Sequence, residues 1–306
     1  MHASIQRILV ATDYSPAAKL ALDFACTIAN KFGADLHLLH VVVEPLPMVV
    51  PEGVWLEPES VLAALARNAK IALTENTKGL QLEPNVHVVR EVKIGYPSDE
   101  IQKYAVEQKM DLIVIGTQGH RGLSRILLGS VAEKTVRIAK CPVMTIHASQ
   151  PREDGEGIAS LIPFRRILVA TDFSPPAGRA RNLGWAIASK YGAELHVLNI
   201  VVEPLPLPGP HGTWIRPEEA TPAYVDSALR SLAEEVKEVE LEPGLVVVRA
   251  VKVGYPVEAI QQYVADHQID LIVLGTQGHG GLSHLLLGSI AEKIVRLAAC
   301  PVLTTH

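Results

Sequence analysis

Short apolar runs alternate with longer helix-like stretches through the first half of the chain. The apolar runs lie at residues 7–11, 35–43, 86–92, 111–115 and 143–146. The helix-like stretches lie at residues 16–31, 58–78, 97–109 and 130–139. Strands that alternate with helices of this length are typical of a parallel sheet joined by right-handed crossovers. The pattern predicts an α/β fold, with a doubly wound, flavodoxin-like or Rossmann-like domain around a five-stranded parallel sheet.

The whole pattern recurs 159 residues further along the chain. Matching pairs are Asp13 and Asp172, Trp55 and Trp214, and Cys141 and Cys300. About half of the aligned positions are identical, so the sequence indicates one domain that has been duplicated. We expect the two domains at residues 1–148 and 163–306, joined by a polar, glycine-containing linker at residues 149–162.

Composition narrows the classes of protein and partner. Hydrophobic residues make up 48% of the chain, which suits strands that are buried on both faces. No apolar run approaches the roughly 18 residues of a membrane span, and the first residues do not resemble a signal peptide. The net charge is -5 with the charges interspersed, so nucleic acid is not an expected partner. We expect a cytoplasmic protein with no membrane partner, whose three cysteines are reduced.

A glycine-rich loop follows the fourth apolar run in each half. The first contains Gly116, Gly119, Gly122, Gly129 and Ser130, and the second contains Gly275, Gly278, Gly281, Gly288 and Ser289. Each loop connects a strand to a helix, whose free N–H groups and dipole favour an anion such as phosphate. The spacing matches neither the dinucleotide fingerprint nor the Walker A pattern. The sequence therefore predicts a nucleotide site that is present twice.

The serine at the end of each loop has a second interpretation. Ser130 and Glu133 have the spacing of a capping box, in which the serine caps the helix that it begins, and Ser289 and Glu292 repeat it. Even a capped helix start directs backbone N–H groups toward the predicted crevice. Ser130 and Ser289 are therefore expected beside the ligand under either interpretation.

An aspartate follows the first strand of each half. In a flavodoxin-like sheet the first and fourth strands flank the point where the strand order reverses, and ligands bind there. Asp13 would then face the crevice of the Gly116 loop, and Asp172 that of the Gly275 loop. Each carboxylate is a candidate for binding ribose, or Mg²⁺ held by phosphates. The alternative is that it only supports the start of the next helix.

Basic residues within the loops differ between the halves. His120 and His279 are candidates for donating to phosphate oxygens, with exposed loop histidine as the alternative. Arg121 and Arg125 would add charge-assisted contacts in the first half. Gly280 and His284 stand at those positions in the second half, so we expect weaker phosphate contacts there if these side chains face the ligand.

No arrangement of residues indicates strong catalysis. The sequence has no nucleophile elbow, no metal-ligand cluster and no lysine placed as in a P-loop. We expect no catalytic residues, and at most weak ATP hydrolysis. His37 and His196 alternate with apolar residues inside strands, which predicts a packing role for both.

The chain resembles the universal stress protein family over nearly its whole length, as a tandem protein. The resemblance rests on residues 10–16, 39–42, 131–137 and 141–143, on the spacing of Gly116, Gly119, Gly129 and Ser130, and on their counterparts in the second half. It implies an adenine-nucleotide site, usually for ATP, at the ends of the first, second and fourth strands of each domain. Residues 11 and 170 are alanines where the family often has proline.

The resemblance also implies which residues contact the nucleotide. Adenine and ribose should meet Ala11, Asp13 and Val41 in the first domain, and Ala170, Asp172 and Ile200 in the second. Ribose and phosphates should meet Gly116, Gly119, Gly129, Ser130 and Val131, and in the second domain Gly275, Gly278, Gly288, Ser289 and Ile290. ADP, AMP or a cyclic nucleotide in place of ATP stays open, because the base would be read largely by backbone groups.

Family members commonly dimerise through their last strands. Here residues 143–147 and 302–306 are able to meet within one chain as a pseudo-twofold pair, and a further homodimer is open. The expected function is ATP binding by a regulatory module of the stress response. The alternatives are a slow ATPase and an interaction or holdase-type stress protein that does not use nucleotide.

Overall fold

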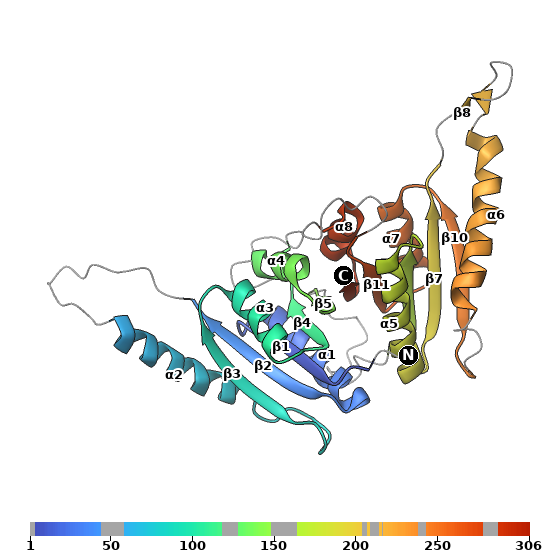
Figure 1. Ribbon diagram of the computed structural model, residues 1–306. Helices are drawn as coiled ribbons and strands as arrows, with labels where there is room; N and C mark the ends of the chain where they lie inside the picture. Colours follow the sequence, from blue (N-terminus) through green and yellow to red (C-terminus); the bar gives the residue numbers. More distant parts are fainter. Residues whose placement is uncertain are drawn as a thin grey trace. The chain divides into compact units, whose positions relative to one another are not determined.

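The computed structural model describes residues 4–43, 58–117, 128–147, 164–203, 207–208, 214–215, 217–237, 243–277 and 287–306. The chain divides after residue 162 into two compact units, called here the first unit and the second unit. Each unit is an α/β domain with a parallel sheet, as the sequence predicts (Figure 1). The predicted linker at residues 149–162 lies outside the described residues.

The elements of the first unit follow the predicted order. The strands are β1 (Arg7–Ala11), β2 (Asp35–Val42), β3 (Val88–Ile94), β4 (Leu112–Gly116) and β5 (Val143–Ile146). The helices are α1 (Pro16–Phe32), α2 (Pro58–Asn76), α3 (Pro97–Glu107) and α4 (Ser130–Ile138). The third strand begins at Val88 and not at residue 86, because its register with β2 pairs Leu36 with Val88 and Val42 with Ile94.

The second unit repeats these elements. Its main strands are β6 (Arg166–Thr171), β7 (Glu194–Val201), β10 (Val247–Val253), β11 (Leu271–Gly275) and β12 (Val302–Thr305). Its helices are α5 (Pro175–Tyr191), α6 (Pro217–Val236), α7 (Pro256–Asp266) and α8 (Ser289–Leu297). A short antiparallel pair, β8 (Leu207–Pro208) and β9 (Trp214–Ile215), lies between β7 and α6, where the pattern predicted from the sequence includes no strand.

The strand order explains how each unit places its loops. The order is β3-β2-β1-β4-β5 in the first unit and β10-β7-β6-β11-β12 in the second. The chain runs outward from β1 to β3 and then returns to β4, so right-handed crossovers place α1 and α2 on one face and α3 and α4 on the other. The order reverses between β1 and β4, and between β6 and β11. The predicted pairing of β5 with β12 concerns the two units relative to each other and stays a prediction.

The central strands form the core because both of their faces are covered by helices. Ile8, Leu9 and Val10 of β1 have no exposed surface, and neither do Leu112 and Ile113 of β4. Continuous apolar runs of this kind are typical of buried parallel strands. Their ends are the only parts of these strands from which polar side chains can reach solvent.

Two histidines inside strands are buried, as the sequence predicts. The Nδ1 atom of His37 lies 2.8 Å from the hydroxyl oxygen of Tyr104, and that of His196 lies 2.8 Å from the hydroxyl oxygen of Tyr263. Burial lowers the pKa of both imidazoles below the ordinary value of 6.5. Both side chains therefore belong to the packing of the units.

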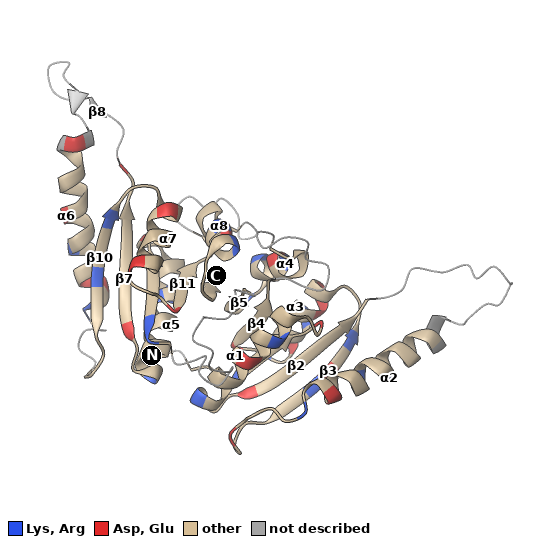
Figure 2. Ribbon diagram, turned by 180° about the vertical axis from the view of Figure 1, so that it is seen from behind, with Lys and Arg blue, Asp and Glu red and all other residues tan. Residues whose placement is uncertain are grey.

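Charged residues are mixed over both units. Figure 2 shows basic and acidic residues interspersed along the helices and strands, with neither sign collected on one element. None of the helices in the described ranges is long and apolar enough to cross a membrane.

Candidate functional site

The carboxyl ends of the central strands bring the predicted site residues together. In the first unit β1 and β4 are neighbours, and Ala11 pairs with Ile115. Asp13 therefore follows β1 at the same edge where the glycine loop leaves β4 at Gly116. This edge is the point at which the strand order reverses, which is where open α/β sheets bind ligands.

The second unit builds the same edge. Ala170 of β6 pairs with Leu274 of β11. Asp172 follows β6 and is exposed, as Asp13 is in the first unit, while the loop after β11 begins at Gly275. The duplicated site predicted from the sequence therefore has the same framework in each unit.

Gly116 and Gly275 have a packing role that the sequence does not reveal. A Cβ atom on Gly116 would lie 2.7 Å from the carbonyl carbon of Ala17, and one on Gly275 would lie 2.8 Å from the Cβ atom of Pro176. Such distances are too short for any side chain, so the first turn of α1 or α5 requires glycine at this position. These glycines let the helix start pack directly against the end of the central strand.

Gly129 and Gly288 stand at the N-caps of α4 and α8. The N–H of Gly129 donates to the carbonyl oxygen of Thr117 at 2.7 Å, and that of Gly288 donates to Thr276 at the same distance. A Cβ atom on Gly129 would lie 2.9 Å from that Thr117 oxygen. Both glycines have negative φ angles, so close approach and not a left-handed conformation explains them.

The predicted capping boxes are wrong. Because a glycine takes each N-cap, Ser130 and Ser289 are the first helical residues, and neither helix has a side-chain cap at its N-cap. Both serines are exposed. The first N–H groups of a helix have no partner within that helix, and its dipole is positive at this end. Each helix start is therefore suited to an anion from outside the helix.

Apolar side chains line the same edge in partly exposed positions. Val41 lies two residues beyond Leu39, the partner of Ala11, and so extends past the end of β1. Val41 and Val131 are half-buried, and so is Ile200, the counterpart of Val41 on β7. Ile290, next to the start of α8, is 43% exposed. The edge therefore offers apolar surface close to the helix start.

A tight turn holds each aspartate. The Oδ1 atom of Asp13 accepts the N–H of Ser15 at 3.0 Å, and Asp172 accepts the N–H of Ser174 at 3.0 Å. The residue after each aspartate, Tyr14 or Phe173, has a φ of 64° or 65°. A bulky residue at positive φ is strained and persists only where its surroundings fix it.

In the first unit the surroundings are aromatic. The ring of Tyr14 stacks on His40 with centroids 4.6 Å apart, and its hydroxyl donates to the carbonyl of Ala69 in α2 at 3.3 Å. The Nδ1 atom of His40 lies 2.8 Å from the carbonyl oxygen of Thr12, and since that oxygen only accepts, Nδ1 carries the proton. Burial raises the pKa of Tyr14 to about 12, so its hydroxyl stays protonated.

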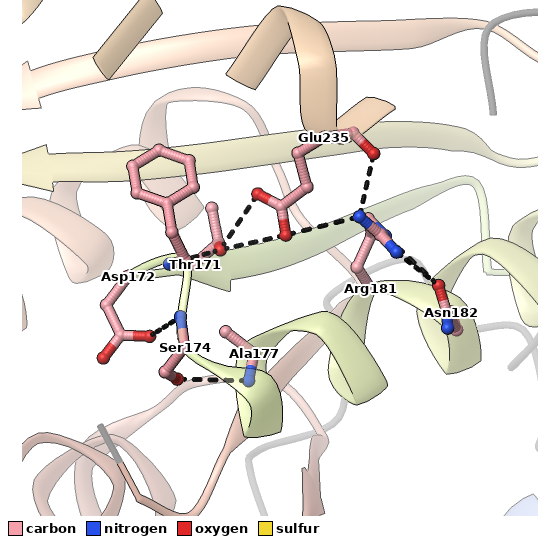
Figure 3. Close-up of polar contacts among 8 residues, drawn as sticks. Thr171, Asp172, Ser174, Ala177, Arg181, Asn182 and Glu235 are labelled. Carbon is pink, nitrogen blue, oxygen red and sulfur yellow. Dashed lines mark hydrogen bonds and ion pairs between the residues drawn. The ribbon is translucent and has the colours of Figure 1, made fainter. Parts of the chain in front are cut away.

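In the second unit the surroundings are charged. The hydroxyl of Thr171 donates to the carboxylate of Glu235 in α6, and Arg181 of α5 pairs with the same carboxylate at 3.6 Å (Figure 3). The amide of Asn199, the counterpart of His40, donates to the Thr171 carbonyl at 2.9 Å. Burial raises the pKa of Glu235, while Arg181 and the hydrogen bond from Thr171 act in the opposite direction.

Sequence reasoning missed these supporting residues. The signal that could have found them is the comparison of the two repeats, in which His40 becomes Asn199 and Asn76 becomes Glu235. The predicted loop residues lie outside the described residues: Gly119, His120, Arg121, Gly122, Arg125, Gly278, His279 and Gly281. Within the described ranges, no group of three or more His, Cys, Asp or Glu side chains is placed to hold a metal ion.

Comparisons with known proteins give the family. The model of the universal stress protein family matches residues 4–147 and again residues 163–306. Universal stress protein Rv2005c of Mycobacterium tuberculosis is 30% identical over 98% of this chain and 96% of its own length. Universal stress protein MJ0531 of Methanocaldococcus jannaschii is 37% identical over 46% of this chain and 81% of its own length.

A solved structure shares the fold over both units. The universal stress protein from Archaeoglobus fulgidus has a TM-score of 0.66 and 24% identity, and the match covers 98% of this chain and 97% of that one. The chain belongs to the universal stress protein family and carries two copies of the family's domain in tandem.

Proposed function

We propose that this universal stress protein binds one adenine nucleotide, ATP in the first place, in each of its two units and acts as a regulatory module of the stress response. The observation that carries the proposal is a helix start without a side-chain cap at the same sheet edge as an exposed aspartate. It occurs at Ser130 and Asp13, and again at Ser289 and Asp172. Two copies of one anion site at the reversal point of a parallel sheet favour a nucleotide.

Each part of the nucleotide has a matching part of the edge. The phosphates would accept N–H groups at the start of α4, near Ser130 and Val131. Asp13 offers a carboxylate oxygen for ribose hydroxyls or for Mg²⁺ that the phosphates bring. Ala11 and Val41 provide apolar surface for adenine. In the second unit these parts fall to Ser289, Ile290, Asp172, Ala170 and Ile200.

A charge placed at the helix start tests the proposal most sharply. Ser130→Glu and Ser289→Glu each put a carboxylate at an exposed first helical position, where an acidic residue is compatible with the helix dipole. The same carboxylate repels phosphate. We expect calorimetric titration with ATP and Mg²⁺ to give two sites in the parent, one in each single variant and none in the double variant.

A control separates charge at the site from charge in general. Gln81 is exposed in the chain that precedes β3, at the opposite edge of the sheet. Gln81→Glu should leave both sites intact, and thermal melting should show that all variants are folded. If parent protein that has been stripped of nucleotide binds no ATP, the proposal is contradicted. The alternative function, an interaction protein that does not use nucleotide, is then favoured. ATP turnover measured on the same samples decides whether slow hydrolysis accompanies binding.

A further inference from the structure

The turn that carries Asp172 is tied to α6 by a continuous set of hydrogen bonds. Glu235 is the second-last residue of α6, and its side chain is 10% exposed. The Thr171 hydroxyl lies 3.2 Å and 3.4 Å from the two carboxylate oxygens of Glu235. The same hydroxyl accepts the N–H of Phe173 at 3.0 Å, inside the turn. The Thr171 hydroxyl therefore donates its proton to Glu235 of α6, while its oxygen accepts the N–H that closes the turn (Figure 3).

Arg181 stabilises the Glu235 carboxylate and the C-terminal end of α6. Its Nη1 atom lies 3.6 Å from the Glu235 carboxylate and donates to the Glu235 backbone carbonyl at 2.8 Å. A carboxylate near a helix C-terminus is opposed by the helix dipole, and a buried charge needs a partner. The Arg181 guanidinium offsets the charge of the Glu235 carboxylate and donates to a carbonyl at the end of α6, which has no partner within the helix.

The first unit supports its turn without this link. Asn76 stands at the position of Glu235 and Leu22 at that of Arg181. The Asn76 amide donates to the carbonyl of Ala72 in its own helix at 2.9 Å. The Thr12 hydroxyl still accepts the N–H of Tyr14 at 3.0 Å, so the turn itself is the same. What differs is the added bond from the Thr171 hydroxyl to the Glu235 carboxylate, which Asn76 does not reproduce for Thr12.

The charge of Asp172 acts on the Glu235 carboxylate. Burial is the main cause that raises the pKa of Glu235, and the negative charge of Asp172 raises it further.

We propose that Glu235 is a positioning residue that sets the Asp172 turn through Thr171, so that α6 controls the nucleotide affinity of the second unit and not of the first. This inference rests on the proposed nucleotide function. A movement or loss of the α6 end frees the Thr171 hydroxyl, releases the strained Phe173 backbone and displaces the Asp172 carboxylate. The second site thereby responds to whatever acts on α6, while the first site does not.

The test compares Glu235→Ala with Glu235→Gln, and uses Asn76→Ala as the matched control in the first unit. Glutamine keeps an oxygen that accepts the Thr171 proton, whereas alanine removes the acceptor. In ligand-free protein, we expect amide hydrogen exchange at residues 172–174 to be about tenfold faster in Glu235→Ala and nearly unchanged in Glu235→Gln. Exchange at residues 13–15 should not change in any of the three variants.

ATP titration completes the test in a Ser130→Glu background, which leaves only the second site. The affinity should fall about tenfold with Glu235→Ala and much less with Glu235→Gln. Glu235→Ala that melts earlier but changes neither exchange nor affinity would overturn the proposal and leave Glu235 a stabilising residue only. If the Ser130→Glu protein with Glu235 intact binds no ATP, the proposed function of the second unit is overturned. The exchange measurement would still decide whether Glu235 holds the turn.

Discussion

The turns that carry Asp13 and Asp172 have one backbone conformation in common. Each aspartate accepts a serine N–H at 3.0 Å, and the next residue has a φ of 64° in the first unit and 65° in the second. The two sequences differ at this next residue, since Tyr14 corresponds to Phe173. Strain of this kind has been kept in both copies, so both aspartates are held in the same exposed position.

The support behind the turns has changed in kind. The first unit uses the ring of Tyr14 stacked on the ring of His40. The second unit uses the ion pair of Glu235 and Arg181. One local geometry is thus compatible with either an aromatic or an ionic support, and the two units are expected to respond differently to substitution and pH.

The largest effect is expected where the units agree. Gly116→Ala places a Cβ atom within 3 Å of the start of α1, and Gly275→Ala does the same at the start of α5. Overpacking of this kind lowers the free energy of unfolding by about 2 to 3 kcal/mol. Gly178 in α5 is the control, because a Cβ atom there meets nothing within 4 Å. Gly178→Ala should stabilise the protein by up to about 1 kcal/mol. Urea unfolding followed for each variant checks both signs.

Removing one partner of the ion pair should have the next largest effect. Arg181→Leu introduces the residue of the first unit and leaves the Glu235 carboxylate buried without its guanidinium. We expect a loss of about 2 kcal/mol in the free energy of unfolding, below the range for fully buried pairs because Arg181 is partly exposed. Adding Glu235→Asn, the other first-unit residue, should recover part of the loss. A double-variant loss equal to the sum of the losses in Arg181→Leu alone and Glu235→Asn alone would show that the pair is not coupled.

The Arg181→Leu loss should depend on pH with a defined sign. The pKa of Glu235 is already raised in the folded protein, and Arg181 is the main factor that opposes this rise. Without Arg181 the folded protein holds the Glu235 proton to higher pH than the unfolded chain does. The free energy of unfolding must then fall as the pH rises through the folded pKa. Melting curves should separate the variant from the parent more at pH 8 than at pH 5.

The smallest effect is expected in the aromatic support. Tyr14→Phe removes one hydrogen bond, 3.3 Å long, to the Ala69 carbonyl and retains the stacking on His40. We expect a loss of less than about 1 kcal/mol and no change in ATP affinity at the second site. Denaturant unfolding and titration of the Ser130→Glu, Tyr14→Phe protein provide the check.

The fold could be predicted because its signals are strong and local. Buried parallel strands give continuous apolar runs, so the positions of β1 and β4 follow from the sequence alone. The end of β3 could not be placed to the residue, because pairing with β2 sets its register. The antiparallel pair of β8 and β9 was also missed, since its two-residue strands carry no periodicity.

The sequence predicted which strand ends and helix starts form the candidate site, but not the residues that hold them in place. The glycine spacing indicated both helix starts, but a serine three residues before a glutamate could not show that Gly129 takes the cap. Close contacts between strand ends and helix starts decide that point, as they do for Gly116. Glu235 lies 63 residues after Asp172 in the chain, and only the fold brings it to Thr171.

Amide hydrogen exchange at the two helix starts, with and without ATP and Mg²⁺, tests the central claim most directly. If nucleotide phosphates bind the N–H groups at the starts of α4 and α8, exchange at residues 130–133 and 289–292 should slow in both units when ATP is added. Saturating ATP that leaves exchange unchanged at both helix starts would contradict the account.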